Sequence, residues 1–246
     1  MSERATGPAM RATDPEIATD EVRLRRLDGV VCAYAAWPAH TLANVPSVVV
    51  IMDLWGVDAA IREIVRRFAK AGIAAIAPDL YARFGAPSGD GVTDADTFRP
   101  FAKRLDRKQY DGDIRAAALW LTTKFPQTRV GIAGLSMGGT LALVQALDNG
   151  DVFAAVAPFY GAIKDIDPDK IHVPVCGSYG ARDTAISAED VRLFRSQLCV
   201  PSDIRIYNTA GHAFMDETRD SYVAAAATDA WARTVAFFKE HLEQKR

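Results

Sequence analysis

The sequence predicts an α/β fold, a single domain whose mostly parallel sheet is flanked by helices on both faces. Short apolar runs of strand length alternate with amphipathic segments of helix length, a pattern typical of parallel strands joined by right-handed crossovers. The continuous β-branched run at residues 47–52 is what a strand buried on both faces requires. We find no repeat and no linker within the 246 residues, so one domain is the simplest interpretation.

The strands are predicted from their apolar and β-branched runs. Val22–Leu27 and Val30–Trp37 are expected to pair antiparallel, because the intervening Asp28-Gly29 is a favoured tight-turn pair. Further strands are expected at residues 47–52, 73–77, 130–133, 152–157, 173–178 and 204–207. Residues 1–20 are polar and without periodicity, which predicts a flexible N-terminal arm and leaves residues 21–246 as the folded domain.

The helices are predicted from apolar positions that recur with helical spacing. Residues 59–71 place Ile61, Ile64, Val65 and Phe68 on one face and charged side chains on the other, and Gly72 ends this helix. Further helices are expected at residues 101–124, 140–147, 187–198 and 222–244. Residues 79–100 are rich in Gly, Asp and Pro, which predicts a long surface loop of the kind that often carries function.

Composition and charge favour a cytoplasmic protein without macromolecular ligands. Hydrophobic residues make up 49% and charged residues 24%, and the net charge of −2 gives no electrostatic case for binding nucleic acid. No apolar stretch approaches the roughly 20 residues of a membrane span, and the N-terminus lacks the apolar core of a secretory signal. The three cysteines are scattered, as expected in a reducing compartment. We expect a monomer or a homodimer.

The hexapeptide Gly134-Leu-Ser136-Met-Gly-Gly139 is the most informative segment. It lies between a predicted strand and a predicted helix, the arrangement of the nucleophile elbow of an α/β-hydrolase. The sharp turn forces Ser136 into an unfavourable backbone conformation, and its neighbours two positions away must lack side chains. The helix N-terminus and the amide of Met137 would stabilise an oxyanion beside Ser136. The alternative is a glycine-rich turn in which the serine caps the helix.

A serine nucleophile needs a base and an orienting acid, which follow it in the chain order Ser, Asp or Glu, His. His212 follows a predicted strand and is the preferred base. His172 is predicted to be a loop residue, and His241 is predicted to face solvent from the terminal helix. Asp183 leaves an earlier strand at the same edge of the sheet and is the preferred acid. Asp183 could instead cap the next helix, and residues 165–169 offer weaker candidates.

The chain resembles the dienelactone hydrolase family of α/β-hydrolases over roughly residues 20–240. The segments that carry the resemblance are residues 52–57, 78–83, the elbow, 160–161, 180–183 and 210–214. The resemblance implies a compact domain without a large cap, hydrolysis of an enol-lactone through an acyl-enzyme, and no metal or other cofactor. It also implies that the backbone amide of Leu54 is the second oxyanion donor.

Three positions depart from the family pattern. Ser136 stands where these enzymes use a cysteine, and Asp53 stands where they carry a glutamate that helps to control that thiol. Arg83 matches the first of two arginines that bind the substrate carboxylate, but Asp216 replaces the second. Arg219 could compensate only if its loop turns inward. Arg83 could also be a solvated loop residue.

The sequence therefore predicts a serine hydrolase that cleaves a small ester or lactone, with altered or relaxed substrate choice. Trp55 and Tyr81 are expected to wall the pocket, with Phe214 beside the histidine, although ordinary core packing would also explain these aromatic residues. The alternatives are a general carboxylesterase or thioesterase and, from another class, a non-catalytic relative that binds a ligand. The four histidines show no paired metal-ligand spacing.

Overall fold

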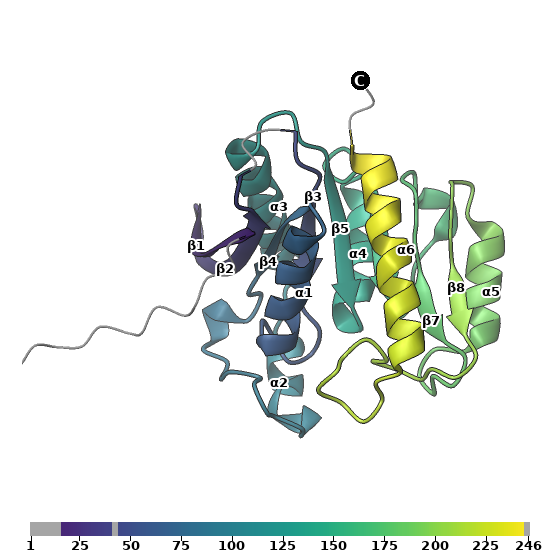
Figure 1. Cartoon of the computed structure of the whole chain (residues 1–246). Helices are drawn as coiled ribbons and strands as arrows, with labels where there is room; N and C mark the ends of the chain where they lie inside the picture. The colour runs from purple at the N-terminus through teal and green to yellow at the C-terminus, as the bar shows by residue number, and fades with distance from the viewer. Residues whose placement is uncertain (1–15, 41–43, 244–246) are drawn as a thin grey trace, which may run out of the picture.

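The computed structural model describes residues 16–40 and 44–243 and contains one eight-stranded sheet with the order β1-β2-β4-β3-β5-β6-β7-β8 (Figure 1). The strands are β1 (Ile17–Arg26), β2 (Gly29–Pro38), β3 (Ser47–Ile51), β4 (Ala74–Pro78), β5 (Val130–Leu135), β6 (Val156–Phe159), β7 (Ser178–Gly180) and β8 (Arg205–Tyr207). The hairpin of β1 and β2 is antiparallel and β2 pairs antiparallel with β4, whereas all pairs from β4 to β8 are parallel. This topology is the predicted α/β fold class.

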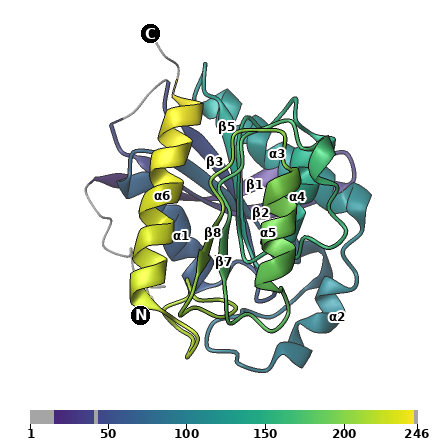
Figure 2. The same cartoon turned by 90° about the vertical axis from the view of Figure 1, so that its right-hand side faces the viewer.

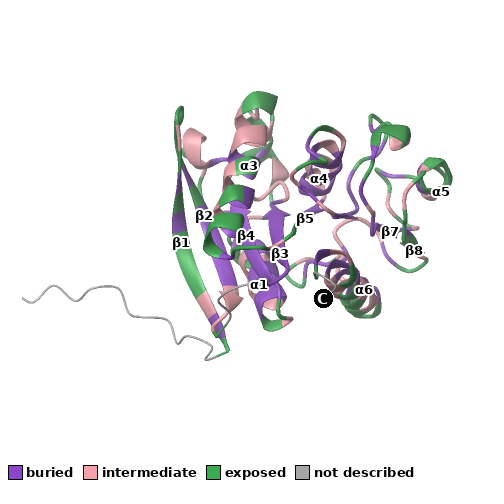
Figure 3. Cartoon of the chain, turned by 90° about the horizontal axis from the view of Figure 1, so that it is seen from above, coloured by how far each residue is buried: buried purple, intermediate pink, exposed green. Residues whose placement is uncertain are grey.

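Helices cover both faces of the sheet. The longer helices are α1 (Ala59–Lys70), α3 (Arg107–Lys124), α4 (Met137–Asp148), α5 (Ala188–Gln197) and α6 (Ala224–Leu242). Seen from above, α1 and α6 lie on one face, and α3, α4 and α5 lie on the other (Figure 3). A view along the sheet from the side of α5 shows the same layers (Figure 2). No helix among the described residues is long and apolar enough to cross a membrane.

The core lies on the central strands, and every residue of β3, β4 and β5 is buried. Helix α1 packs on β2 and β4 with the predicted apolar face, since Ile61, Ile64, Val65 and Phe68 are all buried. Its first turn is capped by Asp58, whose carboxylate accepts a hydrogen bond from the backbone N–H of Ile61 at 3.0 Å. The periodicity therefore located this helix correctly.

Several element boundaries differ from the predictions. The first strand begins at Ile17, so residues 17–20 pair with β2 and are not part of an arm; residues 1–15 lie outside the described part of the chain. The helix expected at 101–124 is divided into α2 (Arg99–Ala102) and α3, because Asp106 caps α3 by accepting a hydrogen bond from the N–H of Gln109. Strand β6 begins four residues later than the predicted 152–157. Strand β7 shares only Ser178 with the predicted run 173–178, in which Val175 forms isolated bridges.

The 79–100 segment is a long connection with little regular structure, as predicted. It contains two short 3₁₀ helices, η1 (Ala82–Phe84) and η2 (Ala95–Thr97), and a third, η3 (Pro168–Lys170), lies elsewhere in the chain. Asp90 accepts a hydrogen bond from the backbone N–H of Ala59 at 2.6 Å, at the start of α1. This segment therefore packs beside the loop that joins β3 to α1.

Candidate active site

Ser136 lies between β5 and α4 in the strained conformation that the elbow requires, with φ 52° and ψ −116°. The turn is so tight that a Cβ atom on Gly134 would lie 2.0 Å from the carbonyl oxygen of Gly138. A Cβ atom on Gly138 would lie 2.3 Å from the carbonyl oxygen of Ile51. The two glycines are therefore required by close backbone approach, and they bring the serine beside the end of β3.

The structure brings the three predicted polar residues into one hydrogen-bonded cluster. Ser136 Oγ lies 2.7 Å from His212 Nε2, and His212 Nδ1 lies 2.7 Å from Asp183 Oδ2. The Asp183 side chain is 2% exposed and that of His212 is 37% exposed. The acid is thus enclosed while the base and the serine can be reached by a substrate. In this geometry the imidazole can take the hydroxyl proton, and the carboxylate can orient the imidazole.

Asp183 is held ionised by its hydrogen bonds. Burial acts to raise the pKa of this carboxyl, but His212 and the backbone N–H groups of Ala185 and Ile186 act against it and hold the pKa below its ordinary value. The two backbone donors also fix the direction of the side chain. Asp183 therefore faces the histidine and does not cap α5, whose cap is Ser187.

The loops that carry the acid and the base touch each other directly. Arg182 N–H donates a hydrogen bond to the carbonyl oxygen of Ala210, at 2.9 Å. A Cβ atom on Gly180 would lie 2.5 Å from the carbonyl oxygens of both Ala210 and Gly211. A glycine at the end of β7 is needed for this approach, which places Asp183 within reach of His212.

Tyr160 supports the histidine loop from the end of β6. It adopts a φ of 39°, an uncommon value for a residue with a side chain, and its ring centroid lies 5.2 Å from that of His212. Burial raises the pKa of its phenol well above the ordinary value, and the N–H of Met215 binds the phenol oxygen. Sequence reasoning assigned no role to this residue, although Tyr160-Gly161 was among the segments that carried the family resemblance.

The two backbone amides expected to bind an oxyanion come from the ends of β5 and β3. Met137 begins α4, where the helix N-terminus favours negative charge. Leu54 follows β3, and its carbonyl oxygen accepts a hydrogen bond from the Tyr81 hydroxyl at 3.2 Å. The same hydroxyl lies 3.8 Å from the sulfur of Met137. The Tyr81 hydroxyl therefore contacts both Leu54 and Met137.

Two of the three aromatic residues expected in the pocket wall are core residues instead. Tyr81 is 1% exposed and its ring stacks on that of Phe98, and Phe214 is fully buried between Tyr160 and Tyr207. Neither ring can be reached by a substrate in this structure. Trp55 is half-buried, with the guanidinium group of Arg219 4.1 Å above its ring and the ring centroid of Phe98 5.9 Å away. The alternative interpretation, core packing, is thus correct for Tyr81 and Phe214.

The expected role of Arg83 as a carboxylate anchor is not supported by its contacts. Its guanidinium group forms an ion pair of 2.9 Å with Asp113 on α3 and donates to the carbonyl oxygen of Asp28 at 2.9 Å. Asp113 is 2% exposed and also binds Arg26. The arginine therefore links the first hairpin and η1 to α3. Because Asp113 is 30 residues away in the sequence, no local pattern indicates it as the partner of Arg83.

Arg219, in contrast, does turn inward. Its guanidinium group lies 4.1 Å above the ring of Trp55 and donates to the carbonyl oxygen of Val92 at 2.9 Å. Its Nε is 3.3 Å from a carboxylate oxygen of Asp216. Arg219 thereby contacts both the loop between β3 and α1 and the 79–100 segment. Its charge is already paired with that of Asp216.

Asp53 lies near the start of the loop between β3 and α1. Its Oδ1 accepts a hydrogen bond from the backbone N–H of Trp55 at 2.9 Å, which orients the loop. Burial, together with the charges of Asp58 and Asp216, raises the pKa of Asp53 to about 7, against the opposing effects of the Trp55 N–H and Arg219. This carboxyl group therefore changes charge near neutral pH. The described residues contain no cluster of three or more side chains suited to a metal ion.

Known proteins share the sequence pattern and the fold of this chain. The model of the dienelactone hydrolase family matches residues 31–242. A Yersinia pestis protein with the name "Putative carboxymethylenebutenolidase" is 34% identical over 85% of this chain and 83% of its own length. The crystal structure titled "Putative Dienelactone Hydrolase", from Klebsiella pneumoniae, is 28% identical with a TM-score of 0.81, and covers 91% of this chain and 99% of that one. Dienelactone hydrolase from Anabaena variabilis, 19% identical with a TM-score of 0.69 over 92% and 99% of the two chains, shares the fold.

Proposed function

This chain belongs to the dienelactone hydrolase family of carboxylic ester hydrolases, and on that premise we propose that it cleaves a small ester or lactone through an acyl-enzyme formed on Ser136. The observation that carries the proposal is the continuous pair of 2.7 Å contacts from Ser136 through His212 to Asp183. The strained serine at a helix N-terminus supports it, because strain of this kind persists where the surrounding structure imposes it.

In the first half of the reaction, His212 takes the proton of Ser136 as its oxygen attacks the carbonyl carbon. Asp183 keeps the imidazole in the required tautomer and stabilises the imidazolium that forms. The amides of Met137 and Leu54 bind the oxyanion, and each such donor typically lowers the barrier by about 3 kcal/mol. His212 then protonates the departing alcohol or enol, and the acyl group stays on Ser136.

In the second half, a water molecule takes the place of the alcohol. His212 accepts its proton, the hydroxide attacks the acyl carbon, and the bond to Ser136 breaks as the histidine returns the proton to the serine. The two half-reactions use the same groups in the same places, so no further catalytic side chain is needed. The products are a carboxylate and an alcohol, or one hydroxy acid from a lactone.

The charges around the site favour an uncharged ester over an anionic lactone. Arg83 is paired with Asp113 and Arg219 with Asp216, so both candidate anchors already hold a carboxylate of the protein. An anionic substrate would have to displace one of these pairs. This observation favours a carboxylesterase with small-acyl specificity as the second candidate within the same chemistry.

The test compares wild type with Ser136→Ala on p-nitrophenyl acetate and on cis- and trans-dienelactone. We expect wild type to turn over the neutral ester, and the variant to lose at least about 10³-fold of kcat. Its thermal stability should be unchanged, because an elbow hydroxyl contributes little to packing. Labelling of Ser136 by a fluorophosphonate, absent in His212→Ala, provides a second readout. Equal rates for wild type and Ser136→Ala would overturn the proposal.

A further inference from the structure

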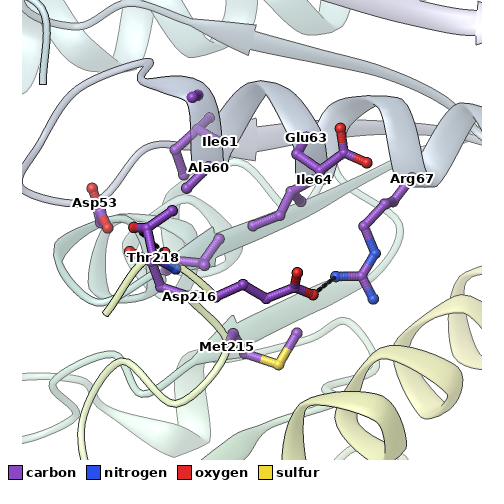
Figure 4. Close-up of a pocket in the computed structure, with 12 residues that line it drawn as sticks. Asp53, Ala60, Ile61, Glu63, Ile64, Arg67, Met215, Asp216 and Thr218 are labelled. Carbon is purple, nitrogen blue, oxygen red and sulfur yellow. Dashed lines mark hydrogen bonds and ion pairs between the residues drawn. The ribbon is translucent and has the colours of Figure 1, made fainter. Parts of the chain in front are cut away.

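A cavity of about 150 Å³ lies between the start of α1 and the loop after His212 (Figure 4). The residues along its walls include Ala60, Ile61, Ile64, Leu135 and Met215, which are all apolar. Asp53 and Asp216 lie at its inner end, and Arg67 lies at the opposite end (Figure 4). There Arg67 contacts Glu217 at 3.9 Å. The cavity is on the face of the sheet covered by α1 and α6, and none of the steps above uses it.

The inner wall of this cavity is built from the direct neighbours of the reacting groups. Leu135 precedes Ser136, Asp53 precedes Leu54, and Met215 lies three residues after His212. An acyl carbon attacked by Ser136 would lie between its Oγ and the amides of Met137 and Leu54. Ser136, Met137 and Leu54 do not themselves line the cavity, so a chain attached to that carbon would enter it past Leu135 and Asp53.

Asp216 and Arg67, two of the charged groups that line the cavity, already have partners in the protein. Asp216 accepts hydrogen bonds from the N–H of Thr218 at 2.9 Å and its hydroxyl at 2.6 Å, and pairs with Arg219. Arg67 lies 4.4 Å above the ring of Trp231 on α6. A charged ligand would find no unpaired partner among these groups, whereas an alkyl chain would gain by covering the apolar walls.

We propose that this cavity is the acyl pocket of the enzyme and that it selects esters of uncharged, apolar acids with medium-length chains. An apolar cavity of about 150 Å³ is large enough to hold benzene, which corresponds to about six carbon atoms. The preferred acyl groups are therefore butanoyl to hexanoyl. The assignment rests on the proposed serine hydrolase function, because the chain must be carried by an ester that Ser136 attacks.

The experiment measures kcat/KM for p-nitrophenyl acetate, butanoate, hexanoate and decanoate, with wild type, Ala60→Leu and Ile64→Val. The longer side chain of Ala60→Leu fills the cavity, and the shorter one of Ile64→Val widens it. Ala188→Leu is the matched control, since Ala188 begins α5 and does not line the cavity. A second series of acetate esters lengthens the alcohol instead of the acid. Thermal melting checks that each variant is folded.

We expect wild type to prefer butanoate and hexanoate to both acetate and decanoate. Ala60→Leu should lower the hexanoate-to-acetate ratio by about tenfold or more, because a single methylene in an apolar pocket changes specificity by this much. Ile64→Val should raise the ratio, Ala188→Leu should preserve it, and the alcohol series should not respond.

A flat acyl-chain profile, or a response confined to the alcohol series, would overturn the acyl-pocket assignment while Ser136-dependent hydrolysis of acetate still stood. Loss of the proposed function would look different, since wild type would then hydrolyse none of the esters in a Ser136-dependent way. A folded Ala60→Leu variant with an unchanged ratio would also overturn the assignment.

Discussion

At the scale of single residues, two carboxyl groups of the candidate site, Asp183 and Asp53, have pKa values shifted in opposite directions. Asp183 receives hydrogen bonds from His212 and two backbone N–H groups, and its pKa is lowered. Asp53 is half-buried, accepts a hydrogen bond from the N–H of Trp55 and lies near two other carboxylates, and its pKa is raised to about 7. Burial is therefore the main cause of the raised pKa of Asp53, whereas at Asp183 the hydrogen bonds and the charge of His212 together outweigh burial.

Asp53→Asn is therefore expected to stabilise the protein at high pH. The folded-state pKa of Asp53 is about 7, and the ordinary value is 3.8. Its contribution to stability is full below about pH 4 and is lost as pH rises through 7. The asparagine cannot ionise and can still accept the Trp55 N–H. At pH 8 the variant should exceed wild type by on the order of 1–3 kcal/mol of unfolding free energy, with a smaller gap at pH 5.

Urea denaturation at both pH values measures this difference. Asp20→Asn, at an exposed position of β1, is the control and should show no such pH dependence. A gap between Asp53→Asn and wild type that is the same at pH 5 and pH 8 would contradict the raised pKa.

At the scale of elements, the candidate site depends on how closely the loops after β7 and β8 approach each other. The closest point is Gly180, where any side chain would meet the backbone of residues 210–211. The strands themselves are only three residues long, so their register alone does not fix the loops. Contacts between the loops therefore determine the distance between acid and base.

Gly180→Ala should separate those two loops and lower kcat by about 100-fold with a smaller change in KM, because displacement of a reacting group by about 1 Å costs this much. Gly150→Ala is the matched control, since its added Cβ would lie no closer than 3.6 Å to another atom. Steady-state kinetics on p-nitrophenyl acetate distinguish the two. Wild-type kcat in Gly180→Ala would show that the loops tolerate the separation.

At the scale of the whole molecule, the three residues of the cluster follow β5, β7 and β8, which lie in the same half of one parallel sheet. The opposite half carries the first hairpin, which Arg83 and Asp113 join to α3. The candidate catalytic residues and the residues that brace the first hairpin therefore lie in opposite halves of the sheet.

Arg83→Gln should consequently lower the free energy of unfolding by about 1–3 kcal/mol, because it weakens a network around a buried carboxylate that keeps Arg26 as a partner. It should change kcat/KM for p-nitrophenyl acetate and for dienelactone by the same factor. Arg99→Gln, which removes a surface ion pair with Asp96, serves as the control for stability. A loss confined to the anionic lactone would restore the carboxylate-anchor role.

The sequence was most informative where local backbone constraints dictate the residue type. The glycines around Ser136, the alternation of strands and helices, and the order of serine, acid and base all depend on short segments that can be recognised in isolation. The partner of Arg83 lies 30 residues further along the chain, and nothing local indicates it. Aromatic residues such as Tyr81 and Phe214 fit a core and a pocket wall equally well, so only the packing could decide.

The contact between Arg219 and Val92 joins segments 127 residues apart in the chain. Because the same guanidinium group also lies over Trp55 and pairs with Asp216, its contacts link residues 216–219, the loop between β3 and α1, and the 79–100 segment. Displacement of any one of these three segments must therefore break a contact of Arg219.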